Sequence, residues 1–249
     1  MRSFRRNCSG QVLVLAALAI ALIISSTMVY VFQMAEAQSL GHPSSSDDYV
    51  RTVKLSTRNL VIGSLADISY GGNTTTLGTN LERWCSFVEN QYYLGKSHVS
   101  FALCERSPYS SGLRLFWGTA GFGVTSAKVD FSMGLTDETT EMSAVYSVNV
   151  TTSIYVSGVH QEYSPNWYAV NVTIHVNNEW EPALAKNFTV YHESETGWQN
   201  SGLLSGYYSE DFGNGTYRAS FVCQNFVNDV SVRLYDWREI FVQANATCA

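Results

Sequence analysis

Cysteine is the residue type in this chain whose number and spacing best suit a covalent reaction. The chain has five cysteines: Cys8 lies in a short basic N-terminal segment, and Cys85, Cys104, Cys223 and Cys248 lie further on. In an oxidising compartment the last four cysteines, an even number, are expected to form two disulfides. Of the three possible pairings we favour Cys85 with Cys104 and Cys223 with Cys248, because each closes a loop of about 20 to 26 residues, worth about 3 kcal/mol. Four buried free thiols are the alternative.

Asparagine glycosylation is the second modification that the sequence predicts. Beyond the first apolar segment, Asn-x-Ser/Thr sequons occur at Asn73, Asn149, Asn171, Asn187, Asn214 and Asn245, and the further sequon at Asn7, in the basic leader, is expected to stay unmodified. Four of these asparagines alternate with the apolar residues of expected strands and should face solvent, whereas Asn73 and Asn214 fall in expected turns. A chain rich in Asn, Ser and Thr also acquires sequons by chance, so glycosylation depends on export of the chain.

Histidines and acidic residues lack the spacing of an active site. The five histidines are scattered, no two cysteines have zinc-site spacing, and Gly118–Gly123 has the glycines of a phosphate loop without its lysine. We expect that segment to be a β-turn. Asp137, Glu138 and Glu141 have the composition of a calcium site, but three carboxylates in a polar loop are more often solvated. We therefore expect no enzyme activity, no cofactor and no metal.

Aromatic residues make up 13% of the chain and include fifteen tyrosines. The adjacent pairs Tyr92-Tyr93, Trp167-Tyr168 and Tyr207-Tyr208 are suited to present rings to a sugar or a protein partner. Aromatic residues also favour β-strands, so the same content is expected of a β-rich core.

Composition excludes several classes of protein and of partner. Apolar residues make up 45% and charged residues only 14% of the 249 residues, against a usual charged share of roughly 25%, which excludes a disordered or coiled-coil chain. Residues 7–249 hold twelve basic and twenty-one acidic side chains, a net charge of −9. Nucleic acid and anionic membrane surfaces are therefore not expected partners of this part.

The elements that must position these residues begin with an apolar segment. Val12–Phe32 is an uncharged run of about 21 residues, which as a helix spans about 31 Å, the thickness of a bilayer core. Three arginines among the first six residues precede the run, and no Lys or Arg follows it until Arg51. The positive-inside rule then predicts a cytoplasmic basic leader at 1–11, a transmembrane helix at 12–37 and an extracellular body in a single-pass cell-membrane protein.

A cleavable secretory signal is the alternative to a retained anchor. Ala35-Glu36-Ala37 before Gln38 is an acceptable cleavage site. The apolar run is longer than the roughly 7 to 15 residues of a signal peptide, which favours the anchor. Both interpretations export the rest of the chain.

Arg6-Asn7-Cys8-Ser9-Gly10-Gln11, directly followed by the apolar helix, resembles the type III signal peptide of archaeal type IV pilin-like proteins and the N-terminus of Tad-type pilus-associated proteins. In those families a short basic leader ends in Gly-Gln or a similar pair, and the helix behind it anchors the subunit and can become the filament core. The resemblance covers the N-terminal segment alone, and Leu15 stands where many processed pilins have Glu.

This resemblance implies a surface protein with a structural or adhesive role, capable of self-assembly and cleaved after Gly10. An uncleaved bitopic anchor remains open. The alternative function is an anchored or secreted extracellular binding module for glycan or protein ligands.

Residues 38–95 are expected to hold a linker and two amphipathic helices. The polar segment Gln38–Ser46 contains a glycine and a proline that end the membrane helix, and apolar residues recur at helical spacing over Asp47–Ile68. Thr79 and Glu82 are expected to cap the second helix. Its expected apolar face comprises Leu81, Trp84, Cys85, Val88 and Tyr92.

From residue 96 onward the apolar period is two, which is typical of half-buried strands. Short strands separated by turn signals such as Gly213-Asn214-Gly215 indicate an antiparallel β-sandwich. We therefore expect a mainly β fold, with a β-rich region at 96–164 and an immunoglobulin-like β-sandwich at 165–249.

The stretch from Asp211 to Tyr217, DFGNGTY, resembles extracellular immunoglobulin-like repeats, in which Asp-x-Gly-x-Gly-x-Tyr enters the penultimate strand. The resemblance covers roughly residues 165–249. It implies that Tyr217 is a tyrosine corner, whose hydroxyl bonds to backbone a few residues upstream. The alternative is an ordinary hairpin turn followed by a core aromatic residue.

Overall fold

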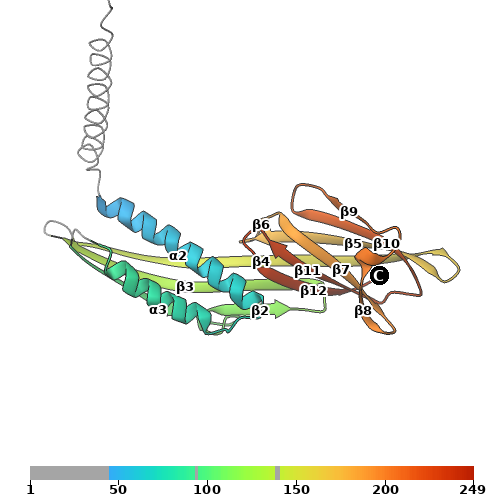
Figure 1. Cartoon of the computed structure of the whole chain (residues 1–249), viewed down its shortest axis with the longest axis horizontal. Helices are drawn as coiled ribbons and strands as arrows, with labels where there is room; N and C mark the ends of the chain where they lie inside the picture. Colours follow the sequence, from blue (N-terminus) through green and yellow to red (C-terminus); the bar gives the residue numbers. More distant parts are fainter. Residues whose placement is uncertain (1–44, 93–94, 138–140) are drawn as a thin grey trace, which may run out of the picture. The chain divides into compact units, whose positions relative to one another are not determined.

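Residues 45–92, 95–137 and 141–249 are described by the computed structural model (Figure 1). The expected leader, the transmembrane helix at 12–37 and the cleavage sites after Gly10 and Ala37 lie outside these residues. Among the described residues, no helix is long and apolar enough to cross a membrane. The chain divides after Thr52, and Val53–Ala249 forms one compact unit.

Two helices form where the sequence has helical apolar spacing. The helix α2 covers Ser45–Ser69, which confirms the helix expected over Asp47–Ile68, and α3 covers Thr76–Glu89. Each buries one apolar face, since Val61 and Leu65 of α2 have no exposed surface. The buried side chains of α3 are Leu77, Leu81, Cys85 and Val88.

The expected cap of α3 is wrong. The N-cap is Thr75, which makes no side-chain capping bond, and Thr79 lies inside the helix. The cause is Asn73, whose side-chain oxygen accepts hydrogen bonds from the backbone N–H and the hydroxyl of Thr75, both at 2.9 Å. This Asx turn starts the helix earlier than a capping box at Thr79 would.

Two antiparallel sheets make the fold mainly β, as expected. The first, sheet A, has the order β1-β3-β4-β5-β10-β9, with β2 also pairing with β3 and β6 with β5. Its strands are β1 (Gly95–Leu103), β2 (Leu113–Trp117), β3 (Phe122–Asp137), β4 (Glu141–Ser164), β5 (Trp167–Asn178), β6 (Glu181–Pro182), β9 (Tyr208–Asp211) and β10 (Thr216–Gln224). The second, sheet B, has the order β12-β11-β7-β8. Its strands are β7 (Ala185–Ser194), β8 (Gly197–Asn200), β11 (Asp229–Asp236) and β12 (Phe241–Thr247).

Two hydrophobic cores lie along sheet A. One contains apolar residues of α2 and α3 together with β3 and the first half of β4, such as Val150. The other lies between the inner faces of sheets A and B and includes Ile154, further along β4. The strand β4 has 24 residues and pairs with β3 along its first part and with β5 along its second. Residues of the region 96–164 thus also contribute to the sandwich core.

The segment Gly118–Gly123 connects β2 to β3 and lets β12 approach sheet A closely. The backbone N–H of Gly121 donates to Asn245 O at 2.7 Å, and the N–H of Asn245 donates to Gly118 O at 2.9 Å. A Cβ at Gly123 would lie 2.0 Å from Gln243 O and clash with it, so only glycine fits at this position. The glycines therefore position β12, whose outer face carries part of the site described next.

Candidate functional site

The outer face of sheet B carries a grid of aromatic and polar side chains. Alternate residues of β12, β11 and β7 share this face, and the strand register aligns them in rows. The rows are Phe241–Tyr235–Asn187, Gln243–Arg233–Thr189 and Asn245–Ser231–Tyr191. Each row joins the consecutive strands β11 and β12 to β7, which is separated from β11 in the sequence by β8, β9 and β10.

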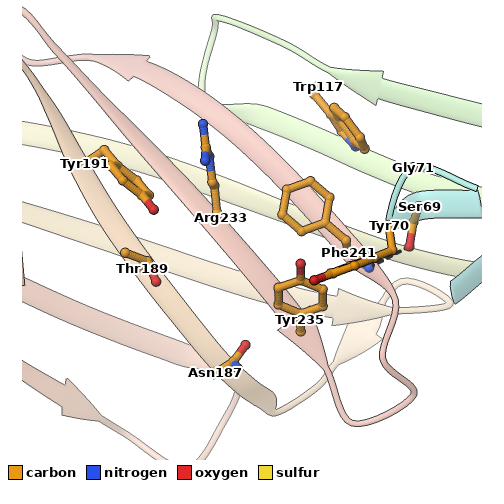
Figure 2. A pocket seen from close by; sticks show the side chains of 10 residues that line it. All are labelled: Ser69, Tyr70, Gly71, Trp117, Asn187, Thr189, Tyr191, Arg233, Tyr235 and Phe241. Carbon is orange, nitrogen blue, oxygen red and sulfur yellow. Dashed lines mark hydrogen bonds between the residues drawn. The ribbon is translucent and has the colours of Figure 1, made fainter. Parts of the chain in front are cut away.

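A cleft of about 520 Å³ opens on this face (Figure 2). Its remaining walls come from the C-terminal end of α2 and from Trp117 at the end of β2. The residues that line it are Ser69, Tyr70, Gly71, Trp117, Asn187, Thr189, Tyr191, Arg233, Tyr235 and Phe241. A volume of this size is in the range of small-molecule sites, roughly 300 to 1,000 Å³.

Four aromatic rings form a continuous series along the cleft. The centroids of Tyr70 and Tyr235 are 6.1 Å apart, those of Tyr235 and Phe241 5.2 Å, and those of Phe241 and Trp117 5.1 Å. Figure 2 shows these rings on one side of the cleft and Tyr191 across from them. Such a series offers apolar ring surface together with two phenol hydroxyls.

Hydrogen bonds hold Trp117 and Phe241, at one end of this series, in place. The indole N–H of Trp117 donates to Thr125 Oγ1 at 3.2 Å, and that hydroxyl donates to Phe241 O at 2.7 Å. Ser69 Oγ accepts the N–H of Phe241 at 2.9 Å, which ties the end of α2 to β12. With its N–H satisfied, Trp117 still exposes 43% of its surface. The ring is therefore positioned before any ligand arrives.

Arg233 is the one charged side chain among the described residues that line the cleft. Its guanidinium carbon lies 4.7 Å from the ring centroid of Tyr191, a cation–π contact. Burial is the main cause of the raised pKa of Tyr235. Tyr70 and Glu239 raise this pKa further, whereas Arg233 lowers it. The phenol is accordingly neutral at pH 7 and available as a hydrogen-bond donor.

A second hollow of about 830 Å³ lies between the β7–β8 hairpin and the β10–β11 loop. Its lining includes Cys223 and His192, and a cysteine beside a histidine can act as a nucleophile with a general base. Burial lowers the pKa of His192 and raises that of Cys223, so the imidazole and the thiol are both neutral at pH 7. His192 is instead within 3.0 Å of the Ser201 hydroxyl. The cleft on sheet B is therefore the better candidate site.

The four body cysteines are buried free thiols, so the structure lacks the two expected disulfides. The carbonyls of Tyr168 and Asn225 lie 3.8 Å and 3.7 Å from Cys223 Sγ, within reach of its one S–H, and this sulfur is not bonded to Cys248. Burial, Asp229 and Cys223 raise the pKa of Cys248 to about 11. Cys85 lies on α3 and Cys104 just after β1. Both pairings stay predictions for the exported protein.

The sequon asparagines are placed unequally. The side chains of Asn73, Asn149, Asn187 and Asn214 are exposed. Asn171 and Asn245 are half-buried, with the oxygen of Asn171 accepting from Ser220 Oγ at 2.7 Å and that of Asn245 accepting from Gln243 Nε2 at 3.3 Å. Asn187 lies in the wall of the cleft. Its modification would therefore affect what the cleft binds.

The aromatic pairs named from the sequence are not the residues that form the cleft. Tyr92 is buried, Tyr168 and Tyr207 pack against the sandwich core, and Tyr93 lies outside the described residues.

Glu138 of the acidic cluster Asp137, Glu138 and Glu141 lies outside the described residues. Within the described ranges, no group of three His, Cys, Asp or Glu is placed to hold a metal ion.

Tyr217 is buried as expected, but its hydrogen bond differs from that of a tyrosine corner. The hydroxyl accepts the backbone N–H of Ala185 at 2.8 Å. Ala185 is 32 residues upstream and belongs to β7 of sheet B. The bond therefore joins the two sheets rather than closing a local corner.

No family model, no curated protein and no solved structure matches this chain. The function is therefore inferred from the geometry of the cleft and from the sequence.

Proposed function

We propose that this chain is an exported, membrane-anchored cell-surface protein that acts as an adhesive module by binding a saccharide in the cleft on sheet B. The single observation that carries the proposal is the cleft itself, with its series of four rings beside polar side chains. The apolar run Val12–Phe32 and the arginines that precede it support the membrane address. The finer assignment of the sandwich as immunoglobulin-like belongs to the same proposal and rests on the DFGNGTY stretch.

A saccharide suits this lining because sugar rings have two kinds of surface. Their C–H faces stack on aromatic rings, and their hydroxyls exchange hydrogen bonds with planar amides, hydroxyls and guanidinium groups. The cleft supplies rings along one side, and Asn187, Thr189 and Arg233 supply donors and acceptors along β7 and β11. Ordered rings cost little entropy when a ligand binds.

Trp117 is the ring whose loss tests the proposal most directly. We expect Trp117→Ala to weaken saccharide binding about 10-fold or more, since a well-packed aromatic anchor contributes about 1.4 kcal/mol or more. Binding is measured with the full-length chain on a glycan array and then by titration of the strongest ligand. Trp198→Ala is the matched control, because Trp198 on β8 is 42% exposed and lies outside the cleft. Equal effects of the two variants, or an array without ligands, would exclude the proposal.

Glycosylation of Asn187 is expected to compete with the ligand. A glycan there would begin in the wall of the cleft, directly opposite Tyr235 in the sheet. In a glycosylating host we expect Asn187→Gln to lose the mass of one glycan and to bind saccharide more tightly. Asn149→Gln, an exposed sequon of sheet A, should lose a glycan without this gain. Tighter binding by both variants would point to a general effect of glycans instead.

A structural filament subunit is the second candidate function. The resemblance of Arg6–Gln11 to pilin-like leaders favours it, because removal of the leader would free the apolar helix to pack against copies of itself. N-terminal sequencing and intact mass of the native protein decide the matter. A chain that begins at Gln11 would support filament processing, one that begins at Gln38 would indicate a secreted module, and an intact Met1 would support the anchored module.

A further inference from the structure

We propose that the saccharide in this cleft is anionic, and that Arg233 binds its carboxylate. The inference rests on the proposed function and adds the chemical class of the ligand. Arg233 is the one cation among the described residues of the cleft, where it lies beside aromatic rings and neutral polar groups. Three observations support the proposal.

First, the Arg233 guanidinium has no hydrogen bond or ion pair with any described residue. Its neighbours across the sheet are Gln243 on β12 and Thr189 on β7, both neutral. The Gln243 amide already donates to Ser231 Oγ and Asn245 Oδ1, each at 3.3 Å. The donors of Arg233 are thus free for a ligand.

Second, no carboxylate of the described chain lines the cleft with Arg233. The acidic group that influences this region is Glu239, through the pKa of Tyr235, and it forms an ion pair with Lys186. Most of the chain is negatively charged, since residues 7–249 carry a net charge of −9. Arg233 is exposed to solvent, and an unpaired cation at a cleft of a protein with this net charge favours an anionic partner.

Third, the contact with Tyr191 orients the guanidinium. Stacking of Arg233 on that ring, at 4.7 Å from its centroid, restricts the long side chain before a ligand binds. An oriented guanidinium presents two parallel N–H donors, which match the two oxygens of a carboxylate. A uronic acid or a sialic acid combines that carboxylate with a sugar ring for the aromatic series.

The test compares each acidic sugar with its uncharged methyl ester, which has nearly the same shape. Suitable probes are oligosaccharides of galacturonic acid, hyaluronan oligosaccharides, sialyllactose and an acidic peptide of similar length. They are titrated into the full-length chain in a detergent without a sugar head group. We expect the acids to bind about 10-fold or more tightly than their esters, since hydrogen bonds to charged groups contribute more than neutral ones.

Variants assign this preference to one side chain. Arg233→Met should reduce acid binding to the level of the ester, and Arg233→Lys should retain part of the preference. Arg218→Met is the matched control, because Arg218 is exposed on β10 of sheet A and outside the cleft. An unchanged melting temperature of Arg233→Met establishes that its effect is on binding.

The outcomes separate the two proposals. Equal binding of acids and esters that depends on Trp117 would overturn the anionic ligand and leave the saccharide module standing. Tight binding of the acidic peptide alone would overturn the saccharide and identify a protein ligand. A preference for acids that persists in Arg233→Met would place the carboxylate elsewhere and overturn the role of Arg233. Failure of every probe to bind would overturn both proposals.

Discussion

A full-length chain in which Arg238 is replaced by methionine is expected to unfold with a free energy about 3 to 5 kcal/mol smaller than that of the unchanged chain. Arg238 lies in the β11–β12 turn with only 17% of its side chain exposed. Its Nε donates to Asp236 Oδ2 at 2.8 Å, and its Nη1 donates to Glu179 Oε1 at 2.7 Å. Its Nη2 donates to Thr151 O at 2.9 Å and to Thr152 Oγ1 at 3.0 Å.

The large expected effect comes from what the substitution leaves behind. Asp236 is fully buried, so its carboxylate would lose its counter-charge without gaining water. It would keep its bonds from the Thr152 hydroxyl and from the backbone N–H groups of residues 238 and 240, which do not neutralise it. Replacing both residues, Asp236→Asn with Arg238→Met, should recover part of the loss because the buried charge is then gone.

Urea denaturation followed by circular dichroism measures the change. Arg218→Met is the control for the loss of a surface arginine, since Arg218 is exposed and pairs across the strand with Glu210. That variant should lose less than about 1 kcal/mol. A loss of the same small size in Arg238→Met would mean that the network is solvated and contributes little.

The sequence predicts the elements of this fold well because local patterns decide them. Period-two alternation indicates a mainly β body, and helical spacing predicts α2, because each pattern reflects one buried face. The start of α3 differs from the expected one because it depends on the side chain of Asn73, which accepts hydrogen bonds from the N–H and the hydroxyl of Thr75. The length of β4 was missed because its two halves pair with different strands.

The cleft could not be predicted from adjacent residues. Neighbouring residues in a strand point to opposite faces, so a pair such as Trp167-Tyr168 cannot line one surface. Arg233 and Tyr235 do share a face at a spacing of two, and that spacing is the signal that the sequence offers. Their partners come from β7, β12, β2 and α2, whose neighbourhood is set by the strand order. The Arg238 network likewise joins residues 59 and 87 positions apart.

Tyr217→Ala is expected to lower the free energy of unfolding by about 3 to 5 kcal/mol, the range for removal of a buried aromatic side chain. Tyr217 is 3% exposed, and its ring centroid lies 5.3 Å from that of Phe188 on β7. Truncation removes ring contacts between the two sheets. It also leaves the Ala185 N–H without the acceptor that it has at 2.8 Å.

Tyr217→Phe separates the contribution of the ring from that of the hydroxyl. It keeps the ring and should cost only about 1 to 2 kcal/mol, because the half-buried Ala185 N–H loses its acceptor. Urea denaturation at pH 8 measures both variants. A midpoint unchanged by Tyr217→Ala would show that the side chain does not pack between the sheets.

The pH dependence provides a second readout of the same hydroxyl. Burial is the largest cause of the raised pKa of Tyr217; the Ala185 N–H opposes the shift, and Asp211 adds to it. The folded state therefore holds the phenolic proton more tightly than the unfolded state, whose tyrosines have a pKa of about 10. The stabilisation linked to this proton is complete below about pH 10 and is lost as the pH rises through the folded-state pKa. In urea titrations between pH 8 and 11 we expect Tyr217→Phe to lose less stability than the unchanged chain, and parallel losses would show that this hydroxyl is exposed to solvent.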